Sequence, residues 1–155
     1  MHRFLGAVCG AFLLVLGACG SSGGPSEFEG RDLYEYEFDF LWEEAQRELK
    51  DQWRVAKADL ETKTIETEWD ERLSPLRSQG FRHRLRVAFE PVEERKWRVR
   101  AFEESERNDE IEKPLDPAEA SWSSSKNEGA LALKFLVNFD RRMRPNEAWR
   151  RETKR

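Results

Sequence analysis

The residues best suited to chemistry in this 155-residue chain are one histidine, His83, and many scattered carboxylates. The other histidine, His2, and both cysteines, Cys9 and Cys19, lie in the first 19 residues. The body of the chain therefore lacks a Cys/His nucleophile pair and a cysteine-rich zinc site. A metal site on His83 would need carboxylates for all its other ligands. Because these carboxylates show no recognisable spacing, we predict no catalytic residues and no metal site. An uncharacterised hydrolase remains an alternative, although no sequence motif supports it.

Arginines form the sharpest polar pattern, because they alternate with apolar residues in segments 81–89 and 97–101. The five are Arg82, Arg84, Arg86, Arg98 and Arg100. A period of two places them on one face of neighbouring strands, where like charges destabilise the sheet unless negative charge lies between them. Two interpretations remain open. The face could bind an anionic lipid, glycan or protein surface, or Glu66 and Glu68 could complete a network of ion pairs.

Aromatic residues allow a second function. Four tryptophans could line an apolar cavity, as in a carrier of lipid or another small apolar ligand, or they could simply pack in the core. They are Trp53, Trp69, Trp97 and Trp122. His83 shares its strand face with apolar residues, so we expect a core or sheet-edge histidine, with a catalytic role as the alternative.

Two helices must help to position these residues. Apolar residues at helical spacing, from Phe38 to Trp53, predict a helix near 39–51, with Asp39 as its possible N-cap. A second helix, near 126–143, is predicted to begin at the capping box formed by Ser125 and Glu128. Its apolar positions are Ala130, Leu133, Leu136 and Val137, and the face could extend to Met143.

Strand periodicity fills most of the remaining chain. A short strand is expected near residues 34–38, and β-prone runs follow at 54–59 and 62–69. In the second run, Ile65, Thr67 and Trp69 should lie opposite Glu66 and Glu68. Segments 81–89 and 97–101 predict a hairpin around a polar turn at 90–96, and the acidic segment 104–121 predicts a loop. The fold class is therefore α+β, one small domain of about four antiparallel strands with both helices on one face.

The N-terminus carries an export pattern. A short basic start precedes an uncharged stretch, residues 4–16, which is typical of a signal peptide. The boundary Leu16-Gly17-Ala18-Cys19 resembles the lipobox of bacterial lipoproteins. This resemblance implies cleavage between Ala18 and Cys19. It also implies that Cys19 carries a diacylglycerol and an N-acyl chain, and no other cofactor is expected. An ordinary secretory cut near Ala18 is the alternative. In Gram-negative bacteria, Gly20 after the cysteine implies the periplasmic side of the outer membrane.

The predicted organisation has four parts: a signal peptide (1–18), a lipidated cysteine with a flexible tether (19–30), the α+β domain (31–144) and a basic tail (145–155). Residues 141–155 hold seven Arg or Lys against two Glu. This basic end either aids solubility or attaches to anionic lipid or polymer. A nucleic-acid partner is not expected for an exported, tethered chain, and the oligomeric state stays open.

The order of elements is similar to the helix-grip domain of BamC-type outer-membrane lipoproteins, which accompany the β-barrel assembly machinery. The chain departs from that family in having room for one such domain rather than two, and a shorter tether. The expected function is a non-enzymatic docking or assembly-accessory module of the cell envelope. Its partners would be the membrane, through the anchor, and an envelope protein or an anionic glycan or lipid.

Overall fold

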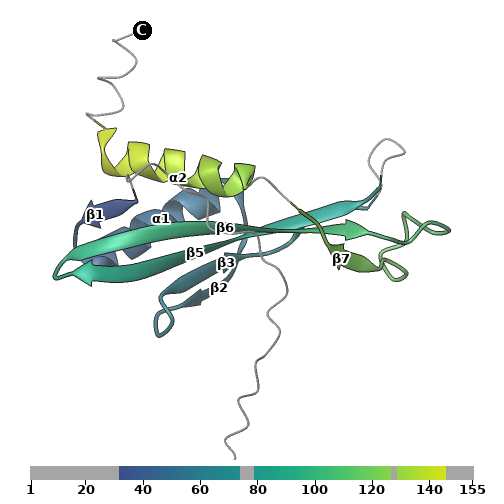
Figure 1. The fold of residues 1–155 in the computed structure, drawn as a ribbon, viewed down its shortest axis with the longest axis horizontal. Helices are drawn as coiled ribbons and strands as arrows, with labels where there is room; N and C mark the ends of the chain where they lie inside the picture. The colour runs from purple at the N-terminus through teal and green to yellow at the C-terminus, as the bar shows by residue number, and fades with distance from the viewer. Residues whose placement is uncertain (1–31, 74–78, 127–128, 146–155) are drawn as a thin grey trace, which may run out of the picture.

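The computed structural model describes residues 32–73, 79–126 and 129–145. One antiparallel sheet carries two helices on a single face (Figure 1), which confirms the α+β prediction. The elements are β1 (Leu33–Glu35), α1 (Phe38–Gln52), β2 (Val55–Asp59), β3 (Thr64–Thr67), β4 (Asp70–Arg72), β5 (Phe81–Glu93), β6 (Lys96–Asn108), β7 (Trp122–Ser124) and α2 (Ala130–Met143). The described sheet has seven strands rather than about four.

The long hairpin of β5 and β6 is the centre of the sheet. The strand order is β1-β6-β5-β3-β2, with β4 also on β5 and β7 also on β6. The predicted turn at 90–96 is too long, because β5 continues to Glu93 and pairs there with Lys96. Likewise β6 continues to Asn108, so the predicted loop at 104–121 is wrong in its first five residues and begins only after them. Acidic residues are compatible with this strand because they lie opposite arginines of β5.

The core lies between the helices and the inner face of the sheet. Its sheet residues are Tyr34, Ile65, Leu85, Val87, Phe89, Val99 and Ala101, all nearly inaccessible to solvent. Helix α1 contributes Leu41, Trp42, Ala45 and Leu49, as the helical spacing predicts. Helix α2 contributes Ala132, Phe135, Leu136 and Phe139. The predicted apolar face of α2 is therefore partly wrong, since Leu133 is exposed and Phe135 and Phe139 are buried.

Both predicted helix caps are wrong. Helix α1 has Glu37 as its N-cap and places Asp39 in the first turn. Helix α2 begins at Ala130 after Gly129, and the Ser125 hydroxyl contacts the Lys126 carbonyl instead of the helix; Glu128 lies outside the described residues. The cap of α2 comes from the sheet, where the Glu103 carboxylate accepts the Leu131 N–H at 2.8 Å. A carboxylate at this end also suits the positive pole of the helix.

A bulge joins β3 to β4 along the edge of β5. Glu66 pairs with Arg86 and Asp70 pairs with His83, so residues 67–69 lie opposite residues 84–85. An extra residue of this kind exchanges the faces toward which the following side chains point. The Thr67 hydroxyl lies within the bulge and accepts the Leu85 N–H at 2.9 Å. Trp69 consequently stacks on arginines of the outer face, and the prediction that it shares a face with Ile65 and Thr67 is wrong.

We predict that Thr67→Val destabilises the domain by about 1–3 kcal/mol, because it leaves the buried Leu85 N–H without an acceptor. Thr67 is 1% exposed, so water cannot replace its hydroxyl. Thr67→Ser is the matched control, since it keeps the hydroxyl. Denaturant unfolding and amide exchange at Leu85 provide the measurements. Equal exchange at Leu85 in both variants would show that the hydroxyl does not stabilise the bulge.

Candidate functional site

The five predicted arginines do share one face of the sheet, opposite the helices. At the β4 and β7 end of the hairpin, the Arg82 Nε donates to Glu106 at 2.6 Å, and Arg84 lies 2.7 Å from Glu104. Both acids belong to β6 and lie directly opposite their arginines in the register. These two pairs therefore link the long strands from side chain to side chain as well as through the backbone.

The arginines of β6 have acidic partners too. The Arg98 Nε lies 3.0 Å from a carboxylate oxygen of Asp32, and the Arg100 Nε donates to Glu90 at 3.1 Å. Of the two acids expected to neutralise this face, Glu66 lies 3.8 Å from Arg84. Among the described residues, Glu68 forms no ion pair and instead lines a pocket. The ion-pair network thus exists, but most of its acids come from other positions.

Stacked aromatic rings complete this outer face. The Arg82 guanidinium lies between the rings of Trp69 and Trp122, 4.6 Å from each centroid. Arg84 lies 4.7 Å from the Trp69 ring. Arg86 lies over the Phe102 ring at 5.0 Å and, within the described part of the chain, has no acidic partner. An anionic ligand on this face would have to compete with carboxylates for four of the five arginines.

His83 lies on the inner face of β5, as predicted, two residues before the buried Leu85. Its Nε2 lies 3.1 Å from Asp70, and its ring stacks on Phe81 at 5.9 Å. Ser105 is its register partner on β6, yet no hydrogen bond joins the two side chains in the described structure. The described residues contain no group of three or more His, Cys, Asp or Glu side chains that could hold a metal.

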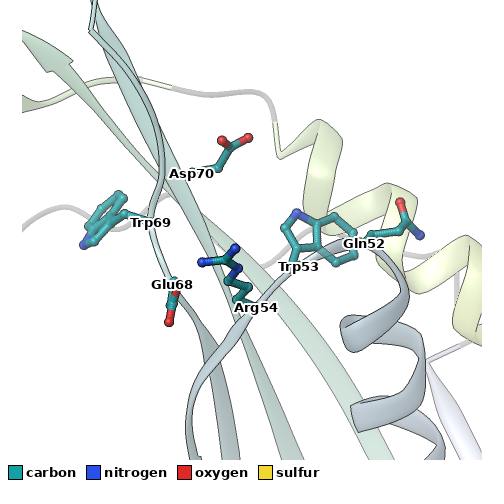
Figure 2. Close-up of a pocket in the computed structure, with 6 residues that line it drawn as sticks. All are labelled: Gln52, Trp53, Arg54, Glu68, Trp69 and Asp70. Atoms are coloured by element: carbon teal, nitrogen blue, oxygen red, sulfur yellow. The ribbon is translucent and has the colours of Figure 1, made fainter.

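A pocket of about 330 Å³ lies between the end of α1 and the bulge (Figure 2). Figure 2 shows the Arg54 side chain between the indoles of Trp53 and Trp69, which point away from each other. The other two tryptophans lie elsewhere, because Trp97 packs on Phe38 at 4.9 Å and Trp122 stacks on Arg82. The prediction that four tryptophans could line one cavity is therefore wrong.

The segment between β6 and β7, residues 109–121, is a feature that sequence reasoning missed. We call it the distal loop, since it lies beyond the part of the hairpin that the helices cover (Figure 1). Ile111 is 85% exposed and Leu115 is 69% exposed. They are the only large apolar residues between positions 104 and 121, and this isolation could have marked them as a possible contact surface. The many acidic residues around them led instead to the prediction of a plain polar loop.

Hydrogen bonds fold the distal loop back on itself. At its base, the Asn108 side-chain oxygen accepts the N–H groups of Glu110 and Ser121. The Glu110 carboxylate accepts the N–H groups of Lys113 and Glu112, and these bonds hold the pKa of Glu110 below its usual range. The loop is thus an ordered structure despite its polar sequence.

The two ends of the described domain meet at the opposite end of the fold. The Arg144 guanidinium donates to the Leu33 carbonyl and lies 4.6 Å from the Tyr34 ring centroid. The Tyr36 hydroxyl donates to the Met143 carbonyl at 3.1 Å. The chain therefore enters and leaves the domain beside β1, whereas the distal loop lies beyond the far ends of β5 and β6.

The predicted lipidation and cleavage residues, Cys19 and Ala18, lie outside the described residues, as do the tether and nearly all of the basic tail. Neither described helix is long and apolar enough to cross a membrane. Comparison with known families and with curated proteins finds no match to this chain.

We predict that Arg82→Lys destabilises the domain by about 1 kcal/mol, because a lysine cannot both stack between two indoles and hold Glu106 through two nitrogens. Tryptophan emission should shift to longer wavelength as Trp69 and Trp122 become more exposed. Arg72→Lys is the control, since that side chain is 60% exposed. Unchanged emission and stability for Arg82→Lys would mean that the stack contributes nothing.

Proposed function

We propose that this chain is a non-enzymatic envelope lipoprotein, anchored by lipid on Cys19, whose α+β domain docks onto another envelope component. The motif Leu16-Gly17-Ala18-Cys19 after an uncharged stretch supports the anchor. Two or three acyl chains attach a protein stably, whereas a single chain is marginal. In a double-membraned host, Gly20 favours the outer membrane.

The meeting of the two ends of the described domain is the observation that carries the docking proposal. A tether of about 12 residues reaches roughly 20 Å, so it would hold the β1 end of the domain near the membrane. From Val99, which bonds to Asp32, β6 continues nine residues to Asn108. At about 3.3 Å per residue this is roughly 30 Å. The distal loop is then the part of the domain best placed to reach a partner.

The basic tail would act at the same end as the anchor. It follows Arg144, which is held against β1, so its arginines and lysines begin where the tether ends. Basic residues near an anionic membrane contribute up to about 1 kcal/mol each. We propose that the tail assists the lipid and plays no part in partner recognition.

We predict that Cys19→Ser abolishes incorporation of labelled palmitate into the protein in a bacterial host. The physical reason is that serine cannot form the thioether that carries the diacylglycerol. Cys9→Ser is the matched control and should leave the labelling unchanged, because Cys9 lies within the predicted signal. Palmitate labelling that survives Cys19→Ser would rule out the anchor.

A separate measurement tests docking. Treatment of intact cells with a lysine-reactive crosslinker should join the lipidated chain to a discrete envelope protein, because a docking module spends much of its time bound. Unrelated lipoproteins of similar abundance provide the control. The docking proposal is wrong if the chain forms no crosslinks. It is also wrong if the chain is crosslinked only to abundant proteins, and no more often than the control lipoproteins are.

A further inference from the structure

We propose that the distal loop docks onto a protein with a basic surface and inserts Ile111 and Leu115 into an apolar pocket of that partner. This inference rests on the proposed docking function and deepens it, since it names the surface and the chemistry of the partner. Three features of the loop support it: apolar exposure, preformed structure and charge.

Exposure is the first feature. Ile111 and Leu115 are the two most exposed large hydrophobic side chains in the described structure, ahead of Leu60 at 59%. A lone exposed apolar residue needs no explanation, but two on one short ordered loop form a candidate contact patch. A few residues provide most of the free energy of binding at protein interfaces, so two apolar side chains can form the core of a small interface.

Preformed structure is the second feature. The Asp109 N–H donates to the Ser121 carbonyl at 2.8 Å and closes the base of the loop. Near the tip, the Asp116 carboxylate accepts the Ala118 N–H at 3.0 Å, and Lys113 pairs with Glu119 at 2.8 Å. A loop already ordered before binding loses less conformational entropy when it binds. Ile111 and Leu115 lie between these bonds, so fixing them against a partner should cost little further conformational entropy.

Charge is the third feature, and it selects the partner. The loop has five acids, Asp109, Glu110, Glu112, Asp116 and Glu119, against one base, Lys113. Among the described residues, no ion pair involves Glu110, Glu112 or Asp116. Complementary charge speeds association and excludes wrong partners, so the partner should be basic around its apolar pocket. The same acids would be repelled by an anionic bilayer, which disfavours membrane insertion of the loop.

A photo-crosslinking experiment on the full lipidated chain in cells tests this inference. A photoreactive amino acid replaces Ile111 or Leu115, and Leu60 is the control because it is apolar and exposed on the turn between β2 and β3. We expect a discrete adduct with one envelope protein from positions 111 and 115, at least tenfold stronger than from position 60. The crosslinked site on the partner should lie beside lysines or arginines.

Charge reversal completes the test. Glu112→Lys should weaken the adduct about tenfold and leave the fold unchanged, because its carboxylate bonds to nothing in the described loop. Adducts with lipid or with a second copy of this chain would overturn the inference, and so would equal adducts from Leu60. A partner found by the lysine-reactive reagent but not from positions 111 and 115 would overturn it while leaving the docking function intact. If neither method finds a partner, both the proposed docking function and this inference are overturned.

Discussion

The pairing of β5 with β6 is the constraint on which the rest of the structure depends. The strands are 13 residues each and pair along nearly their whole length, and β1, β3, β4 and β7 all attach to one or the other. Strict alternation gives this hairpin two different faces. The apolar face binds both helices, and the charged face holds arginines against carboxylates and aromatic rings. Because one register sets both faces, a one-residue slip would expose the core and bury the charges together.

The bulge between β3 and β4 changes the face of the sheet toward which the following side chains point. It keeps Ile65 and Thr67 in the core and places Trp69 over Arg82 on the opposite side. The outer face is thereby held together by paired charges and stacked rings, an arrangement that leaves little unmatched positive charge for an anionic ligand. Within the described structure, the distal loop instead displays two exposed apolar side chains and three acids that form no ion pair, and it lies far from the point where the chain enters and leaves the domain.

The sequence by itself determined the features that depend on local periodicity. Alternation in segments 81–89 and 97–101 identified the central hairpin and the common face of its arginines. Helical spacing located α1 to within one residue at each end, because its apolar stripe is continuous along the helix. The lipobox resemblance depends on four adjacent residues, so it too could be recognised without any structure, and it remains a prediction.

Tertiary structure alone decided the features whose partners are distant in sequence. The cap of α2 comes from Glu103, 28 residues before the N–H that it binds. The extension of β6 through an acidic segment depends on arginines about 20 residues away, and Asp32 neutralises Arg98 only because β1 lies beside β6. The bulge leaves no periodic signal, since it interrupts the period. Periodicity reports which face a side chain occupies within one element, but long-range pairing decides what that side chain meets there.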